Sequence, residues 1–204
     1  MHPCAGLLAS SAKWFSGARV RWIDCSAEPR PRVYFANHSS HLDFVVLWAA
    51  LPETIRAQTR PVAAQEYWES TWLRSYLATR IFQSLLVPRL NVAALAGREA
   101  LSPLLEQLDL GGSLILFPEG TRGDGTEVAE FKSGLCQLCR ERPEVEAVPV
   151  YLENLNHVLP KGGIIPKPLG SRVTFGPPLR TDRAEDSREF LSRARQALRE
   201  LRDR

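Results

Sequence analysis

Short apolar runs alternate with helical stretches along this chain, and this alternation restricts the fold more than any other feature. The runs that end in turn-forming residues are predicted strands: 32–37, 112–117, 145–151 and 172–175. Helical periodicity is found between and around them, at about 41–50, 65–79, 92–109, 131–141 and 184–203. Strands separated by helices are typical of α/β layers. We therefore expect an α/β domain with a mixed or mostly parallel central sheet flanked by helices.

Size, charge and cysteine content narrow the class of protein further. A chain of 204 residues is the length of one ordinary domain, and a net charge of +3 is too small for a nucleic-acid binder. Four cysteines are too few for a disulfide framework, which favours a reducing, cytosolic environment. Cys136 and Cys139 form a C-x-x-C pair inside a predicted helix. Without a second such pair, two small helix-face residues are a better interpretation than a zinc site.

The N-terminal segment, residues 1–28, is predicted to be helical and amphipathic, and residues 29–204 to form the main domain. In the N-terminal segment, large apolar residues recur at roughly helical spacing, with Lys13, Arg19 and Arg21 beside them. These apolar residues are Leu7, Leu8, Trp14, Phe15 and Trp22. This pattern fits a helix on a membrane surface, or equally a helix packed on the domain. The longest apolar run, 44–51, has eight residues, whereas about 20 are needed to span a bilayer, so we expect no transmembrane helix.

A second aromatic pattern lies in the predicted helix 65–79. Trp68, Trp72 and Tyr76 recur every four residues and so share one helical stripe. Aromatic residues with a polar group favour the depth of lipid headgroups, but such stripes more often belong to a core. The core is the expectation here, with membrane contact as the alternative.

The first chemically dense segment, 37–43, follows the first predicted strand. His38 lies in the connecting loop, and Asp43 is placed in the first turn of the next helix. A histidine accepts protons near neutral pH, and a neighbouring carboxylate orients it and stabilises its protonated form. Ser40 and Asp43 also fit a capping-box pattern that needs no catalysis, and this alternative is favoured when the segment is taken alone. His41 is the competing histidine, but it points away from Asp43 on a helix.

The second dense segment, 117–122, reads Phe-Pro-Glu-Gly-Thr-Arg and directly follows another predicted strand. Gly120 permits an unusual backbone turn, while Glu119 and Arg122 are presented at the strand's end. Gly120 and Gly125 have the spacing of a phosphate-binding loop, but Thr126 stands where that loop requires lysine. Dinucleotide-binding and serine-esterase motifs are also absent from the sequence, which argues against dehydrogenases, P-loop kinases and ordinary serine esterases.

Together these segments resemble the lysophospholipid acyltransferase family, in particular the 1-acylglycerol-3-phosphate acyltransferases. The family's N-H-x-x-x-x-D block is present as Asn37, His38 and Asp43, and its F-P-E-G-T-R block is complete at 117–122. An F-K-x-G motif follows at 131–134, and a V-P-V-like strand at 148–150. The order and spacing agree over about residues 30–180.

The resemblance implies acyl transfer from a thioester, acyl-CoA or acyl carrier protein, to the free hydroxyl of a lysophospholipid. It implies His38 as the base and Asp43 as its partner. The substrate-binding residues that it implies are Arg89, Glu119, Gly120, Thr121, Arg122 and Lys132, with Arg89, Arg122 and Lys132 holding the acceptor's phosphate. The chemistry needs no bound cofactor, metal or covalent acyl-enzyme.

One block departs from the family pattern, and it affects the choice of acceptor. 1-Acylglycerol-3-phosphate is the first choice of acceptor. Because Pro88 stands where the family has an acid before Arg89, a lyso-amino-acid lipid or another lysophospholipid is the second choice. A thioesterase or a non-catalytic membrane-binding module are the rival classes. Because both substrates carry acyl chains, we expect a peripheral protein on the cytoplasmic side of the membrane, with no nucleic-acid partner.

Overall fold

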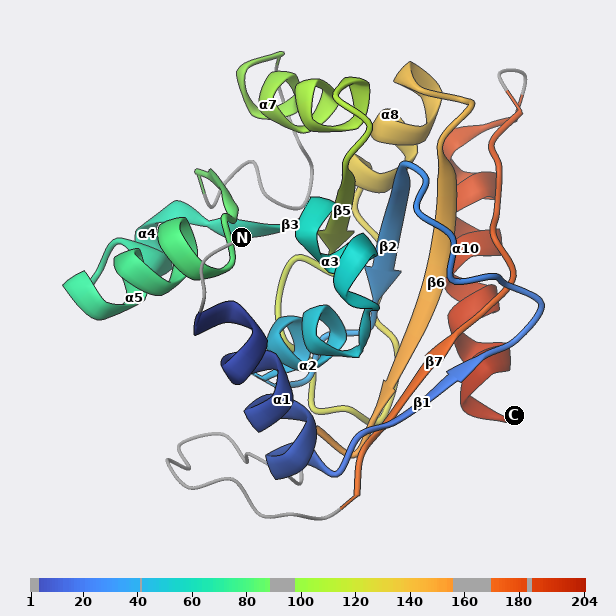
Figure 1. Cartoon of the computed structure of the whole chain (residues 1–204). Coiled ribbons are helices and arrows are strands. Elements are labelled where there is room, and N and C mark those ends of the chain that lie inside the picture. The colour runs from blue at the N-terminus through green and yellow to red at the C-terminus, as the bar shows by residue number, and fades with distance from the viewer. Residues whose placement is uncertain (1–3, 41, 89–97, 156–169, 183–184) are drawn as a thin grey trace.

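The computed structural model describes residues 4–40, 42–88, 98–155, 170–182 and 185–204. Its centre is a seven-stranded sheet in the order β1-β7-β6-β2-β5-β3-β4 (Figure 1). The strands are β1 (Arg19–Trp22), β2 (Arg32–Ala36), β3 (Thr59–Ala64), β4 (Leu85–Val87), β5 (Ser113–Leu116), β6 (Glu146–Glu153) and β7 (Arg172–Phe175). The β6–β7 pair is antiparallel, whereas the remaining neighbours are parallel. The expected mixed, mostly parallel sheet is therefore confirmed.

Helices cover both faces of the sheet, as the sequence predicted (Figure 1). They are α1 (Cys4–Ser16), α2 (Asp43–Ala50), α3 (Glu53–Gln58), α4 (Gln65–Trp68), α5 (Trp72–Tyr76), the π-helical turn η1 (Leu77–Ile81), α7 (Arg98–Asp109), α8 (Gly134–Glu141) and α10 (Ser187–Arg202). Pro103 lies inside α7 without ending it. No helix in the part of the chain described here is long and apolar enough to cross a bilayer.

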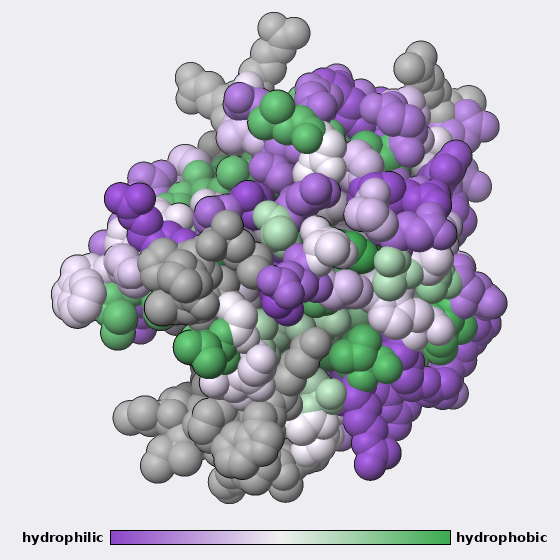
Figure 2. All heavy atoms as spheres, viewed as in Figure 1, coloured by the Kyte–Doolittle hydropathy of each residue, from purple (hydrophilic) through white to green (hydrophobic). Residues whose placement is uncertain are grey.

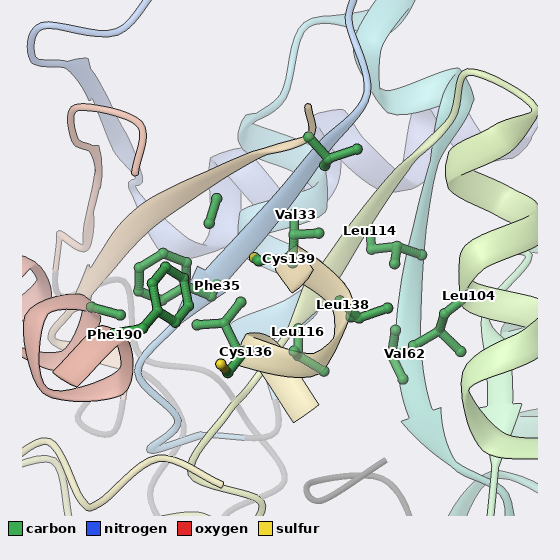
Figure 3. Packing of buried hydrophobic residues seen from close by; sticks show 14 of the residues in the cluster. Val33, Phe35, Val62, Leu104, Leu114, Leu116, Cys136, Leu138, Cys139 and Phe190 are labelled. Carbon is green, nitrogen blue, oxygen red and sulfur yellow. The ribbon is translucent and has the colours of Figure 1, made fainter. Parts of the chain in front are cut away.

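Side-chain alternation along the strands divides the core into two layers. On β2, Val33 and Phe35 join one layer, whereas Tyr34 and Ala36 join the other. This period of two is what a strand buried on both faces requires. Figure 3 shows the first layer, where side chains of β2 and β5 meet those of α7, α8 and α10. The second layer is filled mainly by α2 with part of α1.

Parallel pairing at the centre of the sheet places the two sequence motifs at one edge. β2 lies between β5 and β6, with Phe35 opposite both Leu116 and Pro149. Because these strands run in the same direction, the chain leaves β2 and β5 at the same carboxyl edge. Functional sites of such sheets form at that edge. Segments 37–43 and 117–122 therefore lie side by side.

The N-terminal segment differs from the expected helix in its second half. Helix α1 ends at Ser16, and Arg19–Trp22 form an edge strand that pairs with β7. Helix α1 packs on the domain through Ala9, which is buried, while Leu7 is 73% exposed. The expectation of helix as far as Trp22 is therefore wrong: Val20 and Trp22 alternate with arginines, and their ring and methyl groups pack on the sheet.

The predicted helix 65–79 is broken, and this overturns the expected core stripe. The Thr71 side chain accepts the Arg74 backbone N–H and begins a new helix after α4. Trp68 packs edge-on against Phe44, with ring centroids 5.2 Å apart. Trp72, by contrast, is 79% exposed. Trp68 is therefore half-buried against Phe44, whereas Trp72 lies on the surface.

Cys136 and Cys139 are core residues of α8 (Figure 3). Burial raises the pKa of the Cys139 thiol to about 12, so this group stays protonated at neutral pH. Among the described residues there is no group of three or more metal-ligating side chains. The two small cysteines fill space between α8 and the sheet, as the sequence favoured.

Candidate active site

Asn37 fixes the point at which the chain leaves β2. Its side-chain amide donates to the Leu152 carbonyl at 2.9 Å, and its side-chain oxygen accepts the Leu152 N–H at 2.8 Å. Through these two hydrogen bonds, the Asn37 side chain continues the pairing of β2 with β6 beyond the last backbone contact of β2. The next residue, His38, is thereby held at the carboxyl edge of the sheet.

His38 and Asp43 form a hydrogen-bonded pair at this edge. His38 Nδ1 lies 2.8 Å from Asp43 Oδ2, and the histidine side chain is 23% exposed, whereas the aspartate side chain is fully buried. The His38 ring also stacks on Phe117, with centroids 4.4 Å apart. With Nδ1–H donated to the carboxylate, Nε2 carries the lone pair that can accept a proton.

The same carboxylate also caps the loop, so the structural interpretation of Asp43 is confirmed, while its catalytic role stays a prediction. Asp43 Oδ2 accepts the backbone N–H groups of Ser39 and Ser40 at 2.6 and 2.8 Å. The contact to Ser40 resembles the return bond of a capping box, although α2 begins at Asp43 with Leu42 as its N-cap. Asp43 Oδ1 is buried and has no hydrogen-bond partner within the described residues. One oxygen therefore orders the loop and orients the imidazole.

Glu119 connects the two motifs through the backbone. Its Oε1 accepts the His38 N–H at 2.7 Å, and its Oε2 accepts the Ala129 N–H at 3.0 Å. The residue is buried, and burial raises the pKa of this carboxyl while the two N–H donors oppose the increase. Both oxygens face backbone amides, so Glu119 acts on the loop that carries His38. Nothing in the sequence indicated that the Glu119 carboxylate would bind backbone amides.

Residues 120–123, which follow Glu119, lie next to the loop that carries His38. Gly120 has φ +75°, a left-handed conformation that agrees with the unusual backbone turn expected at this glycine. Gly123 N–H donates to the His38 carbonyl at 2.8 Å, which ties the end of the motif to the histidine loop. Thr121 and Arg122 are exposed between these two glycines. This placement leaves both side chains accessible from solvent.

Lys132 comes to the same edge from a later segment. Its backbone N–H donates to the Pro118 carbonyl at 2.8 Å, and its side chain is exposed. The preceding Phe131 packs edge-on against Phe35 of β2, with centroids 6.1 Å apart. The structure thus brings Arg122 and Lys132 to the loops around His38. Arg89 and His41 lie outside the described residues.

A small cavity of about 10 Å³ lies next to His38. It is lined by Asn37, Ser39, Glu119, Tyr151 and residues 125–128. A space of this size holds one water molecule at most, so an acceptor must reach the imidazole from its exposed side. Tyr151 and residues 125–128 were missed in the sequence, since no motif identifies them.

The fold and the site define an α/β protein with a hydrogen-bonded histidine–aspartate pair at the carboxyl edge of its sheet. Residues 19–153 match the model of the Acyltransferase family, and the chain belongs to that family. The strands and loops that build the His38 site all lie within this range.

Sequence relatives and one solved structure agree with this assignment. The chain is 27% identical over 172 residues to a 1-acyl-sn-glycerol-3-phosphate acyltransferase of Limnanthes douglasii, covering 83% of this chain and 57% of that protein. It is 28% identical to a probable enzyme of the same name from Mycoplasma pneumoniae, covering 64% and 48% respectively. The chain therefore spans about half the length of these curated relatives.

The crystal structure of the 1-acyl-sn-glycerophosphate (LPA) acyltransferase PlsC from Thermotoga maritima has the same fold. The two structures superpose with a TM-score of 0.71 at 21% identity, covering 98% of this chain and 79% of the other. At that identity the likeness concerns the fold. The superposition includes nearly all of the chain, and the N-terminal helix is part of it.

Proposed function

We propose that the protein transfers a fatty acyl group from an acyl thioester to the free hydroxyl of a lysophospholipid. The acceptor we favour is 1-acylglycerol-3-phosphate, which would give phosphatidic acid. The observation that carries the proposal is the 2.8 Å contact between His38 Nδ1 and the buried Asp43, beside the Phe-Pro-Glu-Gly-Thr-Arg turn. Family membership and the names of the relatives support the acyl-transfer class.

The chemistry needs a base, because a thioester is already activated but an alcohol is a weak nucleophile. In the proposed step His38 Nε2 takes the hydroxyl proton while the oxygen attacks the thioester carbonyl. The tetrahedral intermediate then expels the thiolate, which receives the proton from the imidazolium. Asp43 stabilises that imidazolium throughout. The acyl group moves directly from sulfur to oxygen, without a covalent acyl-enzyme.

For the acceptor's phosphate we propose a site made of Arg122, Lys132 and Arg89. Arg122 and Lys132 are exposed on loops joined to the His38 segment, which supports their part in it. Gly120 and Thr121 complete the turn on which Arg122 stands. Glu119 supports acceptor placement indirectly, by joining the loops.

Removing Arg122 should weaken recognition of the phosphate. We expect Arg122→Ala to raise the KM for 1-acylglycerol-3-phosphate roughly tenfold or more, because a charge-assisted contact is lost. The KM for the thioester should change less than about twofold, and Arg122→Lys should restore only part of the loss, since lysine lacks the planar guanidinium. Monoacylglycerol, which lacks phosphate, is the control acceptor. An unchanged KM for the phosphate-bearing acceptor would place the headgroup elsewhere.

The function is tested by acceptor-dependent thiol release. Purified protein is incubated with an acyl-CoA, or with acyl carrier protein charged with the same chain, and with each member of a lysolipid panel. We expect thiol release that requires the acceptor, and phosphatidic acid as the product by mass spectrometry. Release without any acceptor would instead indicate a thioesterase. Release that requires a different lyso-lipid would correct the choice of acceptor.

We further propose that the protein docks peripherally on the cytoplasmic membrane surface, where both acyl chains reside. Large apolar side chains are exposed on α1 and α5: Leu7 at 73%, Trp72 at 79% and Leu73 at 51%. Helices α4 and α5 project from the left side of the molecule in Figure 1, and the same projection carries hydrophobic and near-neutral side chains in Figure 2. Arg74 adds a cation beside Tyr67, 4.5 Å from its ring.

Substitutions on α5 should reduce membrane binding without disturbing the fold. We expect the double variant Trp72→Ser and Leu73→Ser to lower the partition onto anionic vesicles by roughly tenfold or more, because two large apolar side chains no longer enter the bilayer. Leu110→Ser is the matched control, since Leu110 is 78% exposed beyond the end of α7. High salt should weaken binding only in part. Equal losses in both variants, or none in either, would contradict docking through α5.

A further inference from the structure

One peptide group lies between a guanidinium and a buried carboxylate. The Val128 carbonyl accepts two hydrogen bonds from Arg195, from Nε at 2.9 Å and from the terminal nitrogen at 2.6 Å. The N–H of the same peptide group belongs to Ala129 and donates to Glu119 Oε2 at 3.0 Å. Arg195 and Glu119 thus contact opposite ends of a single amide.

Helix α10 holds this loop with a row of arginines. Arg195, Arg199 and Arg202 are spaced i, i+4 and i+7, so they share one face of the helix. The Arg202 guanidinium donates to the Thr126 carbonyl at 2.7 Å, and Arg199 lies 3.3 Å from the Glu127 carboxylate. The apolar face of α10 is buried against the sheet, which makes the helix a rigid support. Hydrophilic side chains dominate the right-hand side of Figure 2, over this helix.

The contact continues from the loop to the histidine. Glu119 Oε1 accepts the His38 N–H at 2.7 Å, so the carboxylate spans from the Val128–Ala129 peptide to the backbone of His38. Glu119 is 4% exposed, and within the described residues its carboxylate accepts hydrogen bonds from backbone N–H groups instead of from a cationic side chain. A buried carboxylate without a cationic partner depends on the strength of its N–H donors. One of its two donors is the amide that Arg195 polarises.

We propose that Arg195 is a positioning residue for His38, acting through the Val128–Ala129 peptide and Glu119. A guanidinium on the carbonyl oxygen makes the amide N–H a stronger donor, because hydrogen bonds in a chain polarise one another. The stronger donor holds Glu119, and Glu119 holds the loop on which the imidazole stands. This role rests on the proposed acyl transfer, and Arg195 itself does not touch the reacting atoms.

The first test compares two arginines of the same helix. We expect Arg195→Ala to lower kcat roughly tenfold while the KM of either substrate changes less than about twofold, since only the placement of the base is lost. Arg195→Lys keeps a charged donor and should retain most of kcat. Arg193→Ala is the control: Arg193 binds Glu185 and the Arg180 carbonyl and does not contact the loop. A kcat for Arg195→Ala equal to that of Arg193→Ala would overturn the proposal.

A double-mutant cycle tests the route of the effect. In a Glu119→Gln background, Arg195→Ala should cost less than about twofold in kcat, because the connection is already broken. Full multiplication of the two single losses would show that Arg195 acts on the enzyme by another route.

Amide hydrogen exchange gives a readout that does not require activity. In Arg195→Ala the Ala129 and His38 amides should exchange several-fold faster, whereas Arg193→Ala should leave them unchanged. Unchanged exchange in Arg195→Ala would refute the connection even if the enzyme is active. Faster exchange in a protein without acyl transfer would support the connection and reject the proposed function.

Discussion

The His38→Ala variant should lose at least about a hundredfold in kcat for acyl transfer while remaining folded, which is the usual loss when a general base is removed. The expected loss comes from the geometry of the pair: His38 Nδ1 is bound to Asp43 at 2.8 Å, which leaves Nε2 as the proton acceptor. The ring is partly exposed, so its removal leaves only a shallow gap beside Phe117. Steady-state kinetics with saturating thioester and lysolipid measure the loss of kcat, and a thermal unfolding curve shows whether the variant remains folded.

His41→Ala is the matched control, since this histidine belongs to the same sequence block. Its expected effect on kcat is mild. Comparable losses in both variants, or an unfolded His38→Ala protein, would assign His38 a structural role instead.

Asp43 offers a way to separate its two roles, and the Asp43→Asn variant should lose about a hundredfold in kcat with little loss of stability. Oδ2 takes part in every hydrogen bond of this carboxylate recorded in the structure, and buried Oδ1 has no partner among the described residues. An asparagine can place its oxygen at the Oδ2 position and its amide nitrogen at the other. The loop then stays capped, but the negative charge that stabilises the imidazolium is gone.

Asp43→Ala should differ from Asp43→Asn in stability. The N–H groups of Ser39 and Ser40 lose their acceptor, and each such unpaired donor costs about 1–3 kcal/mol. Chemical denaturation of both variants gives the comparison. Equal stability of the two variants would show that the backbone contacts contribute little, and full activity of Asp43→Asn would show that the charge does not matter for catalysis.

Much of the framework could be predicted from local pattern. The strands β2, β5, β6 and β7 agree with expectation to within one or two residues, because each is a run of apolar side chains bounded by turn residues. Strands β1 and β3 were not predicted as strands. β3 contains Arg60 and Pro61, and β1 alternates arginine with apolar residues. Such segments become strands only when a neighbouring strand provides hydrogen-bond partners.

In the candidate site too, one contact could be predicted from the sequence and another could not. His38 and Asp43 are five residues apart, so a loop followed by a helix turn was enough to predict their contact. Glu119 lies 81 residues from His38 in the sequence, so no local spacing could predict their contact. Its carboxylate points to backbone amides because the parallel pairing of β2 with β5 aligns the ends of both strands. The family resemblance had instead implied a substrate-binding role for Glu119.

Sequence by itself determined the alternation of strands and helices, the two motifs at strand ends and the histidine–aspartate pair, since these depend on spacings of a few residues. Tertiary structure decided which strands are neighbours, that Trp72 is exposed while Trp68 packs against Phe44, and that Arg195 reaches the Val128 carbonyl. The physical reason is the range of the interactions: periodicity and capping act within a few turns of chain. The backbone groups that Glu119 and Arg195 bind are brought within 3.0 Å only by sheet pairing and helix packing.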